Sequence, residues 1–541
     1  MKNIKILDCT LRDGGRIINC EFPNDEIKDI SYRLAKSKID VVEIGFLRDP
    51  KIVEYNGNST FFTDVDQIIP FVDRTKSTKY VAFVDYELYD FDTLKPFDGT
   101  SIDGIRVGWK KSSFANKKQE IIRCLKRVKE LGYMLYIQGV NTLGYTDRDL
   151  LDILDFVNEI HPNGFGIVDT YGAMYVDDVE RIYTMVDHNL DSDIAIDFHS
   201  HNNYQLSFAF AQEIIRLSNG KREILIDGTL NGMGKVAGNL CTELIVDYLV
   251  RKRNYDYDFD AILDIIDDYV YPYMLKHKWG YSVPALMAGI YKSHPNNVIY
   301  LTEKFRLATK DIKHIMSMID PIKRMSYDYD NIQRLYQEYV DLKIDDSKAI
   351  DCLKKQLENR KILLLMPGSS ITDNRDRLIN YIKENDAIVI MVNFVDTEFM
   401  KTECLCFWGS NKRYEKYKEL RKDVFSIVTS NVKSDNNSDI MVNYDSYINR
   451  NEEYSDNTSL MLIRLLIHIG IKSFDIAGFD GFSEKGSYCN SSVINEGRFI
   501  SKYSEINKAI AGHLKNIAET IGNTSGIHFL TPSIYKPIFE K

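Results

Sequence analysis

Two histidines and an aspartate have the residue types and spacing of a metal site. His199 and His201 directly follow a predicted strand, residues 195–198. Side chains at i and i+2 of an extended chain lie on the same side, so both imidazoles can reach one ion. Asp13 follows the first predicted strand and adds a hard oxygen. Such a set suits Mn²⁺, Mg²⁺, Co²⁺ or Zn²⁺, and ligand type alone does not choose between them. The alternative is two unrelated polar histidines at a strand end.

A glycine-rich loop after the eighth predicted strand is the second candidate element. Gly232 and Gly234 have no side chains, so the backbone there can approach a bound substrate closely. Asn239, at the end of the loop, is placed to open the next helix. A flexible loop with a helix cap explains the same residues without a ligand, and both interpretations stay open.

These residues need a scaffold that brings distant strand ends together, and the first half of the chain predicts one. Short β-rich segments recur with a period of about 31 residues, the size of one βα unit, and helix-period segments separate most of them. This alternation predicts a (β/α)8 TIM barrel, in which the C-terminal strand ends converge on the catalytic face. The eight predicted strands are residues 5–8, 41–45, 80–84, 104–107, 134–138, 166–169, 195–198 and 223–226.

Three separate motifs together resemble one enzyme superfamily. They are Asp-Cys-Thr-Leu-Arg-Asp-Gly at 8–14, His-Ser-His at 199–201 and Gly-Met-Gly-Lys-Val-Ala-Gly-Asn at 232–239. In this order they resemble the DRE-TIM superfamily of HMG-CoA lyase-like enzymes, which includes isopropylmalate synthase. The nearest likeness is to the 4-hydroxy-2-oxovalerate aldolases, which cleave a 4-hydroxy-2-oxoacid to pyruvate and an aldehyde. It covers residues 1–300.

The resemblance assigns provisional roles to the residues of these motifs. It implies that Asp13, His199 and His201 are metal ligands, and that Asn239 lies nearby or is a further ligand. It implies that Arg12 binds the enolate oxygen, with a structural salt bridge as the alternative. Among the possible metals we expect Mn²⁺ first. The implied partners are a small anionic 2-oxoacid and an aldehyde, and we expect a homo-oligomer.

One position departs from the aldolase pattern. The aldolases carry a histidine shortly after Arg-Asp-Gly, proposed as the catalytic base, whereas this chain has Arg16 there. Arginine stays protonated and is a poor base. The proton shuttle is therefore another residue, a metal-bound water, or part of a different reaction. The candidates are Glu43, Asp169 and Tyr171 at predicted strand ends, and each has a structural alternative. Tyr291, also a catalytic candidate, and His294 lie in a downstream segment that resembles the helical cover of the aldolase pocket. Both are candidates for substrate contacts, with a packed aromatic helix and a capping histidine as the alternative.

Positive charge is placed locally, although the chain as a whole is acidic. Arg16 can neutralise an acidic aldehyde or a phosphate on the acceptor, and Arg106, at the end of the fourth predicted strand, can do likewise. The chain has 69 lysines and arginines against 79 aspartates and glutamates, a net charge of −10. This balance argues against broad electrostatic binding to nucleic acid or acidic membranes.

The N-terminus and the cysteines indicate a cytoplasmic protein. The chain reaches Asp8 without the apolar segment of a secretory signal. No segment approaches the ~18 consecutive apolar residues of a membrane helix. The eight cysteines are scattered and are interpreted as reduced thiols.

The rest of the chain predicts two further parts. After a barrel domain of residues 1–257, residues 258–358 are predicted to be a helical cover or linker. Residues 359–541 show a new alternation of strands and helices, which predicts a Rossmann-like α/β domain. The predicted architecture is therefore an α/β protein with a TIM barrel, a helical segment and a second α/β domain.

The predicted second domain carries features of a nucleotide site. A strand runs into the turn 367–370 and then a helix, an arrangement that can place an anion at the helix N-terminus. Segments 458–461 and 471–481 are similar to Rossmann-like domains of sialyltransferase-type proteins. The turn 410–414 can bind phosphate, with a solvated basic turn as the alternative. We expect a nucleotide or sugar nucleotide as ligand.

Three functions remain open from the sequence. The first is a metal-dependent aldolase that makes or breaks a carbon–carbon bond next to pyruvate. The second is a synthase that condenses an acyl-CoA with a 2-oxoacid. The third is a non-catalytic metal-binding barrel, motivated by the missing histidine.

Overall fold

Two compact units, residues 1–332 and 333–541, make up the chain in this computed structural model. The boundary falls within helix α12 (Tyr329–Val340), inside the stretch 258–358 that the sequence predicts as helical. The first unit extends this far because helices α9 to α11 pack on one another within it. The structure describes residues 3–303, 309–340, 344–449, 452–483, 502–522 and 526–539.

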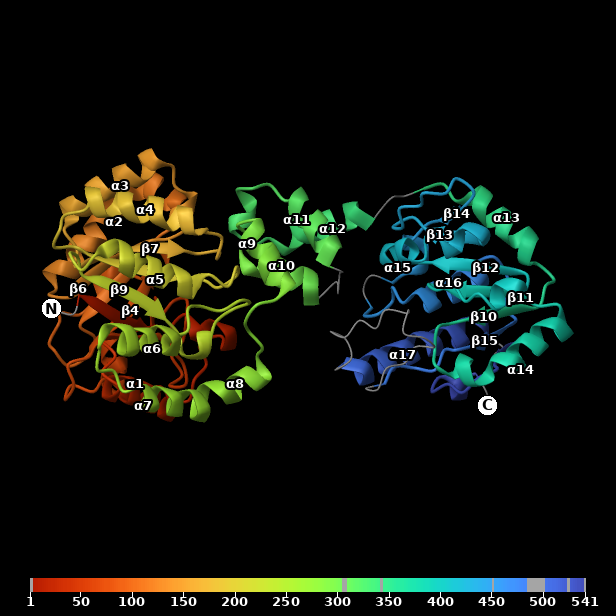
Figure 1. The fold of residues 1–541 in the computed structure, drawn as a ribbon, viewed down its shortest axis with the longest axis horizontal. Helices are drawn as coiled ribbons and strands as arrows, with labels where there is room; N and C mark the ends of the chain where they lie inside the picture. The colour runs from red at the N-terminus through yellow and green to blue at the C-terminus, as the bar shows by residue number, and fades with distance from the viewer. Residues whose placement is uncertain are drawn as a thin grey trace. The chain divides into compact units, whose positions relative to one another are not determined.

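Eight parallel strands close into a barrel in the first unit (Figure 1). They pair in the order β1-β2-β4-β5-β6-β7-β8-β9, and β9 returns to β1. The short β3 (Phe61–Phe62) adds to β2 outside this closure. All eight predicted strands are present, so the predicted TIM barrel is confirmed. The strands are β1 (Ile4–Asp8), β2 (Val41–Leu47), β4 (Lys79–Asp85), β5 (Gly104–Gly108), β6 (Met134–Gly139), β7 (Gly164–Asp169), β8 (Ala195–Ser200) and β9 (Ile224–Gly228).

Amphipathic helices surround the barrel strands (Figure 1). Helix α3 shows why they form where they do: Thr146 caps it reciprocally with Asp149, and Leu150, Leu154 and Val157 recur on its buried face. These helix faces and the outer strand faces form one continuous apolar core. The helices are α1 (Asn24–Lys36), α2 (Lys111–Glu130), α3 (Asp147–Ile160), α4 (Val176–Asn189), α5 (Ser207–Ser218) and α6 (Thr242–Arg253).

Further helices follow the barrel within the first unit. Trp279, before α9, donates its indole N–H to the carbonyl of Asn231 at 2.9 Å, which ties this region to the glycine-rich loop. Among the described helices of the whole chain, none is both long and apolar enough to cross a membrane. The helices are α7 (Phe259–Ile265), a π-helical turn (Ile266–Val270), α8 (Tyr271–Lys276), α9 (Val283–Ile290), α10 (Pro295–Glu303) and α11 (Thr309–Met318).

The second unit is built on a parallel sheet in the order β14-β13-β12-β11-β10-β15-β16. Within this sheet, β10 to β14 follow one another toward one edge, and β15 then pairs with the other side of β10. The strand order therefore reverses between β10 and β15. Apolar cores on both sheet faces are covered by helices, α14 on one and α16 with α17 on the other. The elements are α13 (Ser347–Leu357), β10 (Ile362–Leu365), α14 (Ser370–Asn385), β11 (Ile388–Val392), β12 (Cys404–Trp408), α15 (Asn411–Lys416), β13 (Phe425–Thr429), β14 (Ile440–Val442), α16 (Thr458–His468), β15 (Phe474–Ala477), α17 (Tyr503–Ile521) and β16 (Ile527–Phe529).

Candidate functional site

Asp13 lies in a tight turn that leaves β1 at the C-terminal end of the barrel. The amides of Arg12 and Asp13 donate to the carbonyl of Cys9, at 3.1 and 2.9 Å. The loop after β9 holds the turn from the other side, because the Leu230 amide donates to Oγ1 of Thr10 at 2.8 Å. The turn is anchored on both sides, and the Asp13 side chain is only 6% exposed.

Asp13, His199 and His201 come together at the strand ends. Oδ2 of Asp13 lies 3.8 Å from Nε2 of each histidine, and their ligand atoms lie within 4.8 Å of one another. Burial lowers the pKa of both histidines to about 4. Burial alone would raise the pKa of Asp13, but the charge of Arg12 and then those of the histidines hold it well below its usual range. Neutral imidazoles and an ionised carboxylate are the forms that bind a divalent cation.

Asn239 lies beside this cluster and has an oxygen suited to it. It forms an isolated antiparallel β-bridge with His201. Its Nδ2 donates to the Met233 carbonyl at 3.0 Å, whereas its buried Oδ1 has no hydrogen-bond partner among the described residues. A buried oxygen left unpaired is costly unless a ligand fills the place. The amide oxygen, the imidazoles and the carboxylate together fit a divalent cation.

Gly232 and Gly234 pack directly against Asn239. A Cβ on Gly234 would lie 2.6 Å from Nδ2 of Asn239, and one on Gly232 would lie 3.0 Å from the Asn239 carbonyl oxygen. The Asn239 amide also donates to the Gly232 carbonyl at 3.1 Å. The small residues thus let the loop close around Asn239, while their contact with substrate stays a prediction.

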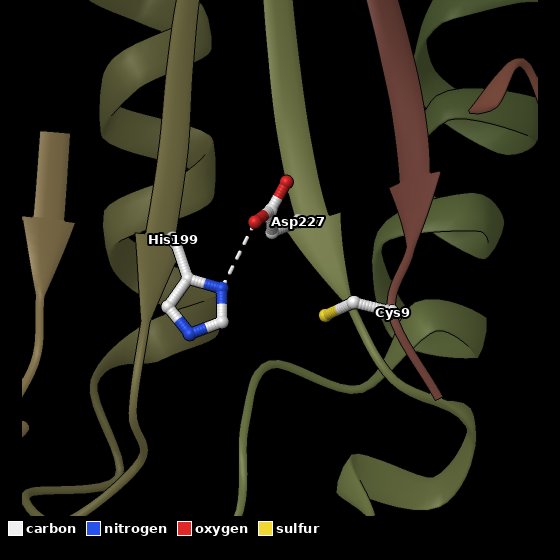
Figure 2. Close-up of side chains that lie close together, drawn as sticks. All are labelled: Cys9, His199 and Asp227. Carbon is white, nitrogen blue, oxygen red and sulfur yellow. Dashed lines mark hydrogen bonds and ion pairs between the residues drawn. The ribbon is translucent and has the colours of Figure 1, made fainter. Parts of the chain in front are cut away.

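Asp227, on β9, orients His199 (Figure 2). Nδ1 of His199 lies 2.9 Å from Oδ2 of Asp227, which leaves Nε2 to face Asp13. The Cys9 thiol points toward the same ring, and Cys9, His199 and Asp227 form a second possible ligand group. It is the poorer metal site. Burial, followed by the charge of Asp227, raises the pKa of Cys9 well above its ordinary value, so the thiol stays protonated.

Arg12 places a fixed positive charge beside the cluster. Its Nε donates to Oε2 of Glu43 at 2.5 Å, and its Nη1 donates to Oδ1 of Asp13 at 2.6 Å. Burial alone would lower the pKa of Arg12, but the charges of Glu43 and Asp13 raise it above the ordinary value. Its guanidinium also lies 4.7 Å from the centre of the Phe83 ring. Arg12 is therefore held both electrostatically and by packing.

Arg106 is fully buried in the barrel interior. Its Nη1 lies 3.0 Å from Oε1 of Glu43 and its Nη2 lies 2.6 Å from Oδ2 of Asp227. It also forms an ion pair with Asp197. These contacts favour a role in positioning Glu43 and Asp227 over the substrate contact that the sequence suggests.

Sequence reasoning missed Asp197 and Asp227, two of the three acidic residues that pair with Arg106. Asp197 and Asp227 are each the only carboxylate in a fully buried barrel strand, and Nε2 of Gln138 donates to Oδ2 of Asp197 at 2.8 Å. A lone carboxylate in a strand buried on both faces needs a charged partner. That rule predicts that each of the two aspartates has a charged partner, but it does not identify Arg106 as that partner.

Comparison with known proteins places this barrel in a family. The family model described as HMGL-like matches residues 3–268. These residues belong to the HMGL-like family. A 4-hydroxy-2-oxovalerate aldolase from Moorella thermoacetica is 24% identical over 316 residues, which span 58% of this chain and 90% of that protein. The same named enzyme from Carboxydothermus hydrogenoformans is 26% identical over 321 residues, 58% of this chain and 90% of that protein. A 2-isopropylmalate synthase from Staphylococcus carnosus is 22% identical over 408 residues, 69% and 76% of the two chains.

In this HMGL-like barrel, Asp169 lies at the end of β7 with its carboxylate turned to its own loop. Oδ1 accepts from the Ala173 amide at 2.8 Å, and Oδ2 accepts from the Met174 amide at 3.2 Å. Burial raises the pKa of Asp169 to about 7. Tyr171 donates to the Met325 carbonyl at 3.2 Å. These contacts favour structural roles, and proton transfer by either residue stays a prediction.

The remaining candidates of the HMGL-like barrel are Arg16, Tyr291 and His294. Tyr291 ends helix α9, is half-buried, and packs against Arg324, whose guanidinium is 5.0 Å from the ring centre. Arg16 lies next to the cluster, with its Nε 3.2 Å from Oδ1 of Asp13. His294 precedes α10, and its ring centre is 4.8 Å from that of Tyr327. The structure thus brings Arg16 to Asp13 and places Tyr291 against Arg324.

The second unit has a cavity of about 140 Å³ at the C-terminal edge of its sheet. It opens between the turns that follow β10, β11 and β15, at the point where strand order reverses. Open α/β sheets bind ligands at such a point. Its lining includes Gly368, Asn393, Arg413, Thr458, Phe479 and Asp480.

The N-terminus of α14, at the edge of this cavity, already binds a carboxylate of the chain itself, that of Asp480. Oδ2 of Asp480 accepts from the Ser370 amide at 2.8 Å, and Oδ1 accepts from the Ser370 hydroxyl at 2.5 Å. Asn457 likewise caps α16 by accepting from the Ser459 amide at 3.0 Å. Both helix ends are satisfied by side chains, so neither resembles an empty phosphate cradle.

Proposed function

We propose that this chain is a divalent-metal-dependent aldolase that forms or cleaves the bond between pyruvate and an aldehyde in a 4-hydroxy-2-oxoacid. The main observation behind this proposal is the cluster of Asp13, His199 and His201 at the C-terminal end of an HMGL-like barrel, with Arg12 beside it. Relatives named aldolase support the same activity. We propose Mn²⁺ as the metal, with Asn239 as a further ligand.

The residues of the site suit the chemistry of an enolate. When bound, a divalent cation polarises the 2-oxo group of pyruvate and stabilises negative charge on its oxygen. Arg12 adds permanent positive charge at that oxygen, and Glu43 and Asp13 hold its guanidinium in position. Asp227 keeps Nε2 of His199 directed to Asp13. In the addition direction, C3 of pyruvate loses a proton and bonds to the aldehyde carbon, and the aldehyde oxygen gains a proton.

Exchange of the pyruvate methyl protons tests this proposal without an aldehyde. The Mn²⁺-loaded protein in D₂O should incorporate deuterium at C3, measured by NMR, because enolate formation is the first half of the reaction. An Arg12→Met variant should exchange far more slowly. Absence of exchange in the loaded wild-type protein contradicts the aldolase proposal. Release of free thiol from acetyl-CoA with a 2-oxoacid would favour the synthase instead.

We propose further that the second unit binds a nucleotide or a sugar nucleotide. The cavity at the reversal of strand order supports this, because it combines Asn393, Thr458 and the aromatic Phe479. Nδ2 of Asn393 donates to Oγ1 of Thr458 at 2.7 Å, which fixes both side chains at the cavity wall.

Calorimetric titration tests this second proposal. AMP, CMP, UMP and UDP-glucose are the probes, and at least one should bind with one site per chain. An Asn393→Leu variant should weaken that binding, whereas the surface variant Lys383→Met should not. If none of the four probes binds at millimolar concentration, the proposal fails.

A further inference from the structure

Three guanidinium groups surround a single phenyl ring at the C-terminal end of the barrel. The guanidinium carbons of Arg12, Arg16 and Arg48 lie 5.8, 4.7 and 4.4 Å from the centre of the buried Phe46 ring. Arg48 has its own carboxylate, since its Nη2 lies 2.5 Å from Oδ2 of Asp85.

Arg16 is the least compensated of these arginines. Its carboxylate contact among the described residues is Asp13, at 3.2 Å, and Asp13 also pairs with Arg12 at 2.6 Å. Asp13 is in addition a proposed metal ligand. Its single negative charge is therefore shared, and much of the charge of Arg16 remains available to an anion. The Arg16 side chain is 40% exposed, so a substrate can reach it.

Lys235 adds a second uncompensated cation. It is half-buried in the glycine-rich loop between Gly234 and Asn239, and within the described ranges it has no carboxylate at ion-pair distance. Its loop lies against the turn that leads to Arg16, because a Cβ on Gly14 would lie 3.4 Å from the Met233 carbonyl oxygen. Burial lowers the pKa of Lys235, and the charge of Arg16 lowers it further. A partly buried ammonium without a counterion is costly, unless the site is completed by a bound anion.

Arg16 and Lys235 come from two segments that are distant in sequence. Arg16 shares the Asp13 carboxylate with Arg12, and Lys235 has no ion pair within the described ranges.

We propose that the aldehyde substrate carries an anionic group, a carboxylate or a phosphate, which Arg16 and Lys235 bind. This inference rests on the proposed aldolase function and names its second substrate class. The carbon–carbon bond forms as in the general reaction, and the product is a 4-hydroxy-2-oxoacid with a second anionic group at its far end. A neutral aldehyde would leave Lys235 without a counterion.

Matched aldehyde pairs test the inference and distinguish the two anions. Succinic semialdehyde is compared with butyraldehyde, and glyceraldehyde 3-phosphate with glyceraldehyde, each with pyruvate and the Mn²⁺-loaded protein. The charged member of one pair should have a kcat/KM about 10- to 100-fold higher, the effect expected of hydrogen bonds to a charged group. The pair that shows the preference identifies carboxylate or phosphate. Equal values in both pairs overturn the inference.

A Lys235→Met variant locates the preference at this site. It should lower kcat/KM for the charged aldehyde about 10- to 100-fold, while deuterium exchange into pyruvate stays unchanged. The exposed Lys126→Met on α2 is the matched control and should change neither. If Lys235→Met slows exchange as much as aldol addition, Lys235 binds the carboxylate of pyruvate and the inference fails. If wild-type protein shows no exchange, the aldolase proposal itself fails; exchange without a charge preference overturns only this inference.

Discussion

Protonation states decide whether the cluster around Asp13 can bind a cation. Arg12 keeps the Asp13 carboxylate ionised, and burial keeps His199 and His201 neutral. Each effect depends on neighbours distant in sequence, such as Glu43, which holds Arg12. The chemistry of these side chains is therefore a property of their surroundings as much as of their type.

Removal of the central carboxylate should abolish metal binding. We expect Asp13→Ala to lose stoichiometric Mn²⁺, because the two histidines then remain without the negative charge that offsets the cation. Metal content after dialysis measures this. The exposed Asp152→Ala on α3 serves as the control and should keep its metal. Stoichiometric Mn²⁺ on Asp13→Ala would remove Asp13 from the ligand set.

The pKa of His294 predicts a pH dependence of stability. Its pKa is about 4 in the folded protein, against 6.5 for the ordinary value. Because the unfolded chain binds the additional proton between these values, stability is lost as pH falls from 6.5 toward 4. Between pH 7 and pH 5, the free energy of unfolding of the wild-type protein should fall by about 2 kcal/mol more than that of His294→Gln. Unfolding of both proteins at the two pH values measures this, and an NMR titration midpoint near 6.5 would contradict it.

At the scale of the elements, the loop from β9 to α6 does more than connect a strand and a helix. It delivers Asn239 and Lys235 to the barrel end, and the Gly280 amide donates to its Val236 carbonyl at 2.9 Å. Gly238 makes the tight return possible. Its φ is +70°, and a Cβ there would lie 2.0 Å from the Gly232 carbonyl oxygen.

Substitution of this glycine should damage the proposed metal site. We expect Gly238→Ala to destabilise the barrel by about 2 kcal/mol or more, and to weaken Mn²⁺ binding about 10- to 100-fold through displacement of Asn239. Gly220→Ala is the matched control, since Gly220 has the same φ of +70° but no atom within 4 Å of an added Cβ. It should cost about 1 kcal/mol and leave metal affinity unchanged. Equal affinity losses in both variants would show that Gly238 does not act through Asn239.

At the scale of the whole molecule, the two units have separate apolar cores. One core joins the barrel strands to their surrounding helices, and others lie on the two faces of the second sheet. The proposed metal site lies entirely in the first unit and the cavity beside Asp480 entirely in the second. Each proposed ligand is therefore bound by one unit alone.

Separate cores predict separate unfolding. Calorimetry of the full chain should show two transitions, because each unit buries its own apolar surface. A ligand stabilises only the unit that binds it, so Mn²⁺ should raise the temperature of one transition and leave the other in place. Asp13→Ala should abolish that shift. A single transition that moves as a whole with Mn²⁺ would show that the units unfold together.

Local pattern in the sequence was enough to predict the barrel and the three-residue cluster. Few folds accommodate eight alternating strands and helices, and a closed parallel barrel is one of them. Because such a barrel brings its C-terminal strand ends together, the sequence alone predicts that Asp13 and His199 lie close to each other. The roles of Arg106 and Asp227 could not be predicted this way. Both lie in strands that are buried on both faces, where only the barrel's register and curvature determine which charges meet. The same limit applies to Asp480 in the second unit. The turn at 367–370 predicts an anion at the helix N-terminus. In the tertiary structure that anion is the Asp480 carboxylate, which follows a strand more than 100 residues away.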